Sequence, residues 1–282
     1  MEIKQLVDTN TYNTLKQFSK NLVSLKIEIR FLCYHSVTHS EDLPRVVHTP
    51  TITENAFRRQ MRQIEKMGFK AISVEQSFQL LQAKESPGKY VCITFDDGYL
   101  DNWTIAWPIL KQMGYPAHFF ITSDWIGQKF EKHINGSPIK VECMNEQMLF
   151  DLAQQNASIG SHGKTHCDLT KIDPGQVVIE LQESKRKLKA IVGHDINFFS
   201  YPYSFYDTRT IKELERAGYN SAFTIETRGF HKLHSRDKYR MSRIVIKGNE
   251  DDELFKLKIC GGFDWTYWYT VFKRRISITL RK

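Results

Sequence analysis

Apolar stretches of strand character alternate with helical repeats along this chain. Residues 26–34 (KIEIRFLCY) alternate between polar and apolar side chains and then become apolar, as a strand entering a core does. Thr53 is a suitable cap for a helix whose apolar residues recur at helical spacing until Gly68 ends it. The first predicted unit is therefore a strand followed by a helix.

The same alternation continues through most of the chain. Strands are expected at 70–73, 90–95, 117–121, 158–161, 197–201 and 220–225, and helices near 75–83, 101–113, 146–155, 175–192 and 208–217. Residues 123–145 interrupt the pattern, and we interpret them as a lid or rim loop. Repeated β-α units predict a parallel sheet, which is either open and doubly wound or closed as a barrel. Periodicity does not separate these two forms.

Length and composition agree with one large folded domain. The 282 residues are 41% hydrophobic and 26% charged, which supports a packed core and argues against wholesale disorder. The net charge of +8 is compatible with nucleic acid, anionic lipid or acidic polysaccharide as a partner. No recognisable nucleic-acid motif accompanies this charge, so no nucleic-acid partner is expected.

Cysteine usage and the chain start bear on the compartment. The five cysteines are odd in number and include no CxxC pair, which argues against a disulfide framework or a zinc knuckle. The first residues lack the apolar region and cleavage site of a secretory signal, and no apolar run approaches ~20 residues. If Met1 is the natural start, these features favour the cytoplasm, including the inner face of the membrane.

Residues 263–282 combine aromatic and basic side chains. FDWTYWYTVF is followed by three adjacent basic residues and, at the end, by two more. Aromatic belts beside basic clusters suit peripheral contact with an anionic membrane. A packed terminal helix or strand with a solvated basic end is an equally good interpretation.

Two polar motifs follow predicted strands, at the edge where parallel α/β folds place their sites. In VCITFDDGY, residues 91–99, an apolar strand runs into Asp96 and Asp97. Adjacent residues can face different sides of a site, so one carboxylate can hold a metal ion while the other handles a proton. Solvated acids in an Asx turn are the alternative for this motif taken alone.

The second motif is GSHGKTHCDLT at 160–170, with His162 and His166 four residues apart. This spacing allows two imidazoles to converge on one cation, although surface histidine pairs also occur by chance. Two neutral imidazoles and one carboxylate would offset one of the two charges of a divalent ion, which could still acidify bound water. The two motifs together favour a hydrolytic metal site.

These ordered motifs resemble those of the polysaccharide deacetylase family, also called the NodB-homology carbohydrate esterases, over about residues 28–246. The resemblance implies a distorted (β/α)7-type barrel at 26–262, with an extension at 1–25 before it and the tail at 263–282 after it. It also implies removal of an N-acyl group, with acetyl the expected one, from an amino sugar of a polysaccharide or its precursor.

The resemblance assigns roles to residues of both motifs. Asp96 would be the catalytic base, and one divalent ion would be held by Asp97, His162 and His166. Zinc suits these ligands, and cobalt, nickel or manganese could occupy the same triad. FSYPYS is similar to the third family motif, so one wall of the substrate groove would comprise Tyr201, Pro202 and Tyr203, with the Tyr203 N–H donating to the developing oxyanion.

The sequence departs from the family pattern at two of these motifs. Many relatives have an arginine that orients the base where this chain has Ser200, and another basic residue could substitute for it. Many also have Ser or Thr where this chain has Gly163, so other hydrogen bonds must hold that loop.

The general acid is expected near the start of the chain. The C-terminal LxxH motif that usually supplies it is not found after residue 225, where His231 and His234 lie in a polar segment. In a family subset resembling the exported biofilm-polysaccharide deacetylases, the barrel is circularly permuted and an N-terminal strand supplies this histidine. FLCYHSV at 31–37 matches that arrangement, which assigns His35 as the acid. A structural histidine at a strand end is the alternative.

Two other functions remain open. The missing signal peptide favours a deacetylase or deformylase of a small or lipid-linked sugar precursor over one that acts on an exported polymer. The chain could also be a carbohydrate-binding protein that keeps the barrel but has lost catalytic activity. Retention of the presumed ligands and of both acid and base candidates argues against such a protein.

Overall fold

The computed structural model describes residues 28–39, 50–83, 88–134, 137–225, 238–248 and 250–262. The 1–25 extension, the histidines at 231 and 234 and the tail at 263–282 lie outside these ranges, so what the sequence predicts for them stays a prediction. Within the described ranges, no helix has the length and apolar character needed to cross a membrane.

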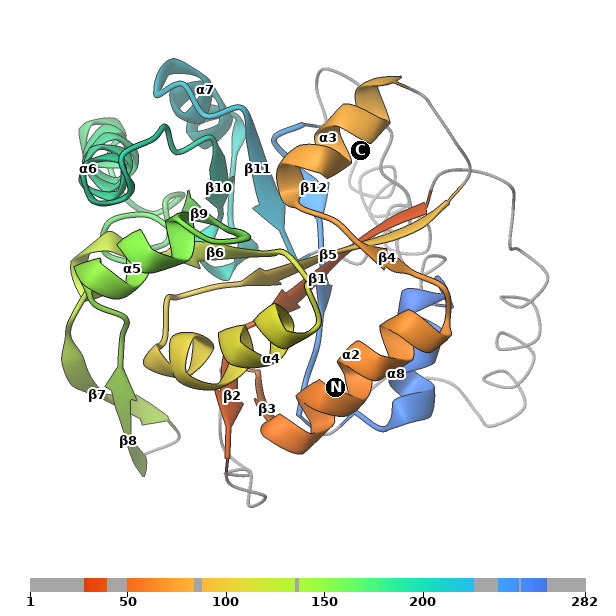
Figure 1. The fold of residues 1–282 in the computed structure, drawn as a ribbon. Coiled ribbons are helices and arrows are strands. Elements are labelled where there is room, and N and C mark those ends of the chain that lie inside the picture. Colours follow the sequence, from red (N-terminus) through yellow and green to blue (C-terminus); the bar gives the residue numbers. More distant parts are fainter. Residues whose placement is uncertain are drawn as a thin grey trace, which may run out of the picture.

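A parallel sheet closes on itself at the centre of the molecule (Figure 1). Its neighbours, in spatial order, are β1 (Glu28–Tyr34), β5 (Lys89–Phe95), β6 (Ala117–Ile121), β9 (Ala157–Ser161), β10 (Phe198–Ser200) and β11 (Ser221–Thr224). One extended segment then joins the two edges, because β12 (Met241–Ser242) pairs with β11 and β13 (Ile244–Val245) pairs with β1. This closure decides between the two expected sheet forms in favour of the barrel.

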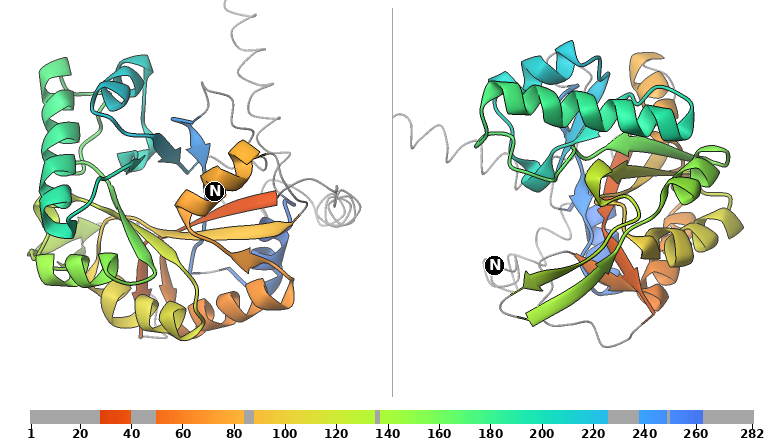
Figure 2. Two further views of the ribbon diagram at one scale, coloured as in Figure 1. Left: turned by 45° about the horizontal axis from the view of Figure 1, so that its top comes forward. Right: turned by 90° about the vertical axis from the view of Figure 1, so that its left-hand side faces the viewer.

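Helices surround this sheet on its outer side (Figure 2). They are α2 (Glu54–Lys66), α4 (Trp107–Gln112), α5 (Glu146–Ala153), α6 (Pro174–Val192), α7 (Thr208–Arg216) and α8 (Asp252–Ile259). Near the carboxyl end of β1, β2 (Ser36–Thr38) pairs with β3 (Thr51–Thr53), and β4 (Lys70–Ala71) pairs with the first half of β5. The β-α alternation that the sequence predicts is thus confirmed.

Helix starts follow the capping residues of the sequence. As expected, Thr53 caps α2, since its hydroxyl accepts a hydrogen bond from the Ala56 N–H at 3.1 Å. Four later helices begin in the same way, at the caps Asn145, Asp173, Asp207 and Asp251. These caps fix where each helix starts and so limit the loops that precede them.

Aromatic rings fill the barrel interior. The Phe120 and Phe223 rings lie 5.4 Å apart between centroids, and Phe31 packs on Phe223 at 5.3 Å. Helix α3 (Val74–Ala83) closes the end of the barrel at which strands begin, where Phe78 stacks on Phe198 with centroids 5.3 Å apart. The opposite end, where the strands finish, is left for polar side chains.

Two segments contain structure that the sequence does not predict. Residues 123–145, which we interpret from the sequence as a lid or rim loop, form the 3-10 helix η3 (Ser123–Trp125) and an antiparallel hairpin, β7 (Lys129–Ile134) and β8 (Ser137–Glu142). The helix expected at 101–113 begins as a π-helix, η2 (Asn102–Ala106), before α4. Pro108 is the second residue after the π-helix, and it has no N–H with which to continue an ordinary helical ladder.

Candidate functional site

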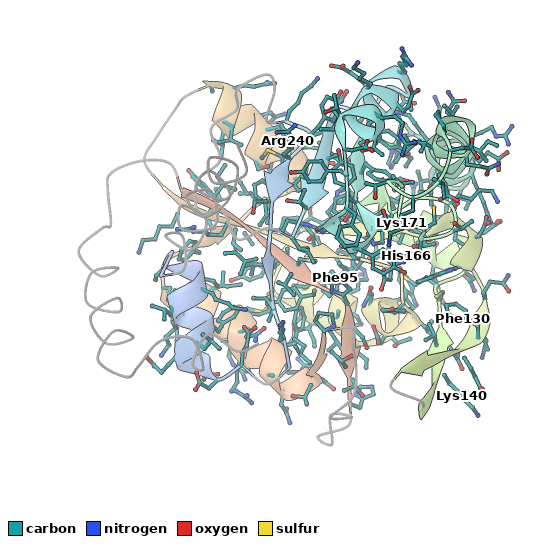
Figure 3. The ribbon with its side chains drawn as sticks, turned by 180° about the vertical axis from the view of Figure 1, so that it is seen from behind. Phe95, Phe130, Lys140, His166, Lys171 and Arg240 are labelled. Atoms are coloured by element: carbon teal, nitrogen blue, oxygen red, sulfur yellow. The ribbon has the colours of Figure 1, made fainter. Side chains whose placement is uncertain are left out.

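The predicted site residues meet where the barrel strands end. Asp96 and Asp97 follow β5, His162 follows β9, and the loop after it carries His166. Figure 3 labels His166 and also Phe95, the last residue of β5, which directly precedes Asp96 and Asp97.

Asp97, His162 and His166 form a compact group of ligand atoms. Asp97 Oδ1 lies 3.4 Å from His162 Nε2 and 3.2 Å from His166 Nε2. His162 Nδ1 lies 2.8 Å from the Ser200 carbonyl oxygen, which makes Nδ1 the protonated nitrogen and leaves the Nε2 lone pair facing Asp97. The structure therefore brings together the three ligands expected from the sequence.

A divalent cation fits this group. Asp97 Oδ1 is buried and makes no hydrogen bond to any part of the chain that the structure describes. Burial opposes ionisation of Asp97, but the two imidazoles lower its pKa well below the usual value. An ionised oxygen facing two imidazole nitrogens is a suitable donor set for zinc or a similar ion.

A second group, Cys33, His35 and Asp96, also has ligand atoms within 4.8 Å of one another. Here the carboxylate is already occupied, because Arg243 donates to Asp96 Oδ1 at 2.6 Å and to Oδ2 at 2.7 Å. The group of Asp97 is therefore the better candidate for a cation, because the Asp96 carboxylate already has a charged partner.

The backbone of the site is strained. Four non-glycine residues have positive φ in the described ranges, and all four lie here, namely Asp97 at 76°, His166 at 64°, Tyr203 at 56° and Ser204 at 61°. The left-handed region is costly for such residues and persists where the surrounding structure enforces it. Strain is thus concentrated at the end of the barrel that carries the ligands.

Arg243 supports Asp96 in place of the arginine that the sequence lacks at position 200. It lies between β12 and β13, is fully buried, and forms a bidentate ion pair with the Asp96 carboxylate. Its second terminal nitrogen also donates to Ser200 Oγ at 2.6 Å, and Ser200 Oγ donates to Asp96 Oδ2 at 3.1 Å. The small serine therefore leaves room for an arginine from another strand.

The Asp96 carboxylate is held in its ionised form. Burial raises its pKa, but the neighbouring charge of Arg243 more than offsets this effect, so the pKa of Asp96 falls below its usual value. The Arg243 guanidinium lies 5.0 Å from the Phe120 ring centroid and 5.9 Å from that of Phe223, over the aromatic layer of the barrel. Sequence reasoning missed Arg243 because no strand was predicted at 241–245.

Glu180 holds the loop that carries His166. From α6, its carboxylate accepts hydrogen bonds from the Lys164 N–H at 2.8 Å and from the Thr165 N–H at 3.0 Å and hydroxyl at 2.7 Å. Gly163 adopts a φ of 82°, and a Cβ there would lie 3.3 Å from a Glu180 oxygen. Because position 163 is a glycine and offers no side-chain hydroxyl, the loop needs other hydrogen bonds, and Glu180 supplies them.

Replacing Glu180 by glutamine should weaken metal binding, because the amide cannot accept all three hydrogen bonds and His166 loses its support. We expect affinity for a divalent metal ion to fall about 10- to 100-fold. Titration of the metal-free protein with zinc measures this. Glu183→Gln, an exposed change on the same helix, is the control, and equal affinities for the two variants would contradict a role for Glu180.

Trp125 connects the hairpin to the ligand loop. Its ring stacks on His166 with centroids 5.0 Å apart and packs on Phe130 of β7 at 5.1 Å. The N–H groups of Ser123 and Asp124 donate to the carbonyls of residues 163 and 164 at 3.1 and 2.9 Å. The hairpin β7–β8, which projects from the barrel in Figure 1, is therefore linked through Trp125 to His166, one of the candidate ligands.

His35 lies beside Asp96, as predicted for an acid and base pair. Its Nδ1 is 4.0 Å from Cys33 Sγ, which in turn lies 3.6 Å from Asp96 Oδ2. Burial lowers the pKa of His35, and the carboxylates of Asp97 and Asp96 oppose that effect. An imidazole in this position can carry a proton on the side of the site away from His166.

The three groove residues of the third motif differ in exposure. Tyr203 is 58% exposed, and its ring meets the His166 ring at 4.6 Å. Pro202 is buried against the His162 loop, while Tyr201 is buried and donates its hydroxyl to the Tyr239 carbonyl at 3.1 Å. Of the three, Tyr203 is therefore the one whose side chain is exposed, and Tyr201 belongs to the core.

Comparisons with known proteins agree with this geometry. The sequence profile described as polysaccharide deacetylase matches residues 83–222. The chain is 29% identical over 214 residues to YxkH of Bacillus subtilis, whose name places it among the polysaccharide deacetylases, covering 73% of this chain and 70% of that protein. It is 23% identical to the poly-β-1,6-N-acetyl-D-glucosamine N-deacetylase of Staphylococcus epidermidis, covering 76% and 73%.

Two solved structures share the fold. The deacetylase PplD of Streptococcus pyogenes, in complex with acetate, superimposes with a TM-score of 0.71 at 22% identity, over 83% of this chain and 99% of that one. IcaB from Ammonifex degensii gives 0.66 at 22% identity, over 84% and 97%. Both comparisons support the barrel as the architecture of this chain.

Proposed function

Since this chain belongs to the polysaccharide deacetylase family and is a carbohydrate N-deacetylase, we propose that it removes acetyl groups from amino sugars within a glycan. The proposed metal site is Asp97, His162 and His166. The observation that carries the proposal is the juxtaposition of this donor set with a second, separately held carboxylate on Asp96. Adjacent carboxylates with different partners suit two different tasks.

The cation, when bound, would act as a Lewis acid toward the amide carbonyl and would acidify water. Asp96 accepts the proton of the attacking water, since Arg243 and Ser200 keep its carboxylate ionised and oriented. The Tyr203 N–H donates to the oxyanion that develops on the carbonyl oxygen.

His35 completes the cycle by protonating the amine nitrogen as the carbon–nitrogen bond breaks. Acetate and a free amino group on the sugar are the products. The position of His35 beside Asp96 supports this role, because the proton must be delivered to the leaving nitrogen while the base faces the attacking water.

Release of acetate from N-acetylated glycans tests the proposal. The metal-loaded protein is assayed against β-1,6-linked N-acetylglucosamine oligomers, carrier-linked N-acetyl sugars and their N-formyl counterparts, with acetate and formate measured separately. We expect acetate from the glycan. Absence of turnover across the whole panel would instead favour an inactive carbohydrate-binding protein.

An exposed aromatic pair at the site favours a polymer over a small precursor. Four large apolar side chains are exposed in the described ranges, and two of them, Tyr203 and Phe205, lie together with ring centroids 6.3 Å apart. Tyr203 contacts the metal ligand His166, so the pair extends outward from the reacting centre. Sugar rings next to the one being deacetylated would find an apolar surface there.

Phe205→Ala should therefore impair oligomers more than monomers. We expect KM for an N-acetylglucosamine oligomer to rise about 2- to 10-fold, as loss of one aromatic contact implies, with little change for the monosaccharide. Steady-state kinetics on both substrates measure the difference. Phe150→Ala, an equally exposed phenylalanine on α5, is the matched control, and a similar effect from it would contradict the assignment.

A further inference from the structure

His35 lies where the chain leaves the barrel, and its backbone is held differently on its two sides. Before it, the barrel ladder fixes the chain, since the Ile246 N–H donates to the Cys33 carbonyl and the Asp96 N–H to the Tyr34 carbonyl, both at 3.0 Å. After it, residues 36–38 form β2, which pairs with β3 instead of a barrel strand. The ladder therefore cannot set the direction of the chain beyond His35.

Two side chains of the segment after β5 supply that support. Asn102 Nδ2 donates to the His35 carbonyl at 2.6 Å and to Asp101 Oδ1 at 2.8 Å. Ser36 Oγ donates to Asp101 Oδ2 at 2.5 Å, and the Val37 N–H also donates to this carboxylate. The three residues from 35 to 37 are thus held by one neighbouring pair.

This arrangement is costly. Burial raises the pKa of Asp101 to about 7, although the donors from Ser36, Val37 and Asn102 oppose the shift. Within the described ranges no basic side chain is among the groups that act on the Asp101 carboxylate, and Asn102 is fully buried. A desolvated carboxylate without a cation destabilises the fold unless its hydrogen bonds are used for something else.

We infer that Asp101 and Asn102 are positioning residues for His35, which they hold against the reacting centre through its backbone and through Ser36. This inference rests on the proposed function, in which His35 is the general acid. The short segment 96–102 would then supply the base, one metal ligand and the two side chains that position the acid. The π-helix starts at Asn102, where the two side chains face His35 and the start of β2.

Two substrates with different leaving groups test the inference. An N-acetylglucosamine oligomer needs a proton on its leaving amine, whereas 4-nitrophenyl acetate releases a stable phenolate without one. For Asp101→Asn and Asn102→Ala we expect kcat on the amide to fall about 10- to 100-fold with KM nearly unchanged. On the ester the same variants should keep the native rate within about threefold, because general-acid help is not needed there.

Three controls sharpen this test. Asp173→Asn changes a carboxylate that accepts the Gln176 N–H at the start of α6 and has no contact with His35, and it should alter neither rate. His35→Ala should show the same selective loss on the amide. In the His35→Ala background, Asp101→Asn should add little, because residues that act as one unit are not additive.

Equal losses on amide and ester would overturn the inference and leave Asp101 with a purely structural role. A crystal structure of Asp101→Asn provides a readout that does not depend on deacetylation. We expect a displaced His35 ring with Asp96 and Asp97 unmoved, and an unmoved ring would also overturn the inference. If the native protein hydrolyses the ester but no N-acetyl glycan, the proposed function fails, while the displacement of His35 still decides the inference.

Discussion

Exchanging Asp96 for asparagine is expected to leave the divalent cation bound while kcat for glycan deacetylation falls about 10²- to 10⁴-fold. Asparagine has nearly the shape of aspartate but cannot take a proton from the attacking water. The ligand atoms of Asp97, His162 and His166 are not altered by this change. Metal content by elemental analysis and kcat on an N-acetylglucosamine oligomer are measured on the same preparation.

The neighbouring residue is the matched control. Asp97→Asn makes the same chemical change one position later, and it should remove both the cation and the activity, because Oδ1 of Asp97 is the anionic ligand. Asp96→Asn leaves the Arg243 charge without its partner, so a loss of about 3–5 kcal/mol in the free energy of unfolding is expected and thermal unfolding must be recorded alongside. A near-native rate for Asp96→Asn would overturn its assignment as base.

Replacing Arg243 by methionine should shift the pH dependence of the reaction. Burial alone raises the pKa of Asp96, and Arg243 is the main group that brings it below its usual value. Without the arginine, the base becomes protonated at a higher pH, so the acidic limb of kcat/KM moves upward. The native carboxylate adds stability above its unfolded pKa that is lost as pH falls, and this contribution should disappear in Arg243→Met.

A pair of further variants separates this electrostatic role from loss of packing. Ser200→Arg combined with Arg243→Ser returns the cation to the position it has in many relatives, and it should restore part of the native pH profile. Arg240→Met removes a half-buried guanidinium that lies 5.6 Å from the Tyr206 ring centroid, and it should leave the profile unchanged. Arg243→Met with an unshifted acidic limb would contradict the role given to Arg243.

The sequence predicts most of the barrel but not its closure. The strands with long apolar runs, such as 90–95 and 117–121, are confirmed as β5 and β6. The closing segment 241–245 was missed because its strands have only two residues each, with a charged Arg243 between them. A short run of this kind has no periodicity to detect, and its strand character comes from pairing with β1 and β11.

The candidate site likewise contains residues that the sequence predicts and residues that it does not. Ligand residues could be predicted because their spacing along the chain reflects their chemistry, and the structure brings Asp97, His162 and His166 together. Arg243 and Glu180 could not, since their roles depend on contacts across 147 and 15–16 positions that only the fold creates. Whether the chain is a circularly permuted form of its family stays a prediction, which the place of His35 directly after β1 supports.

The residues of the candidate site are encoded in a definite order along the chain, and Arg243 in the closing segment comes last. Both halves of the metal site, and the acid with its support, are encoded before residue 167. The counter-charge of the base is encoded in the last strand of the barrel, on Arg243. A chain that ends before this segment contains all three candidate ligands but lacks the group that does most to lower the pKa of Asp96. In the finished fold, the segment that closes the barrel also supplies the counter-charge of this carboxylate.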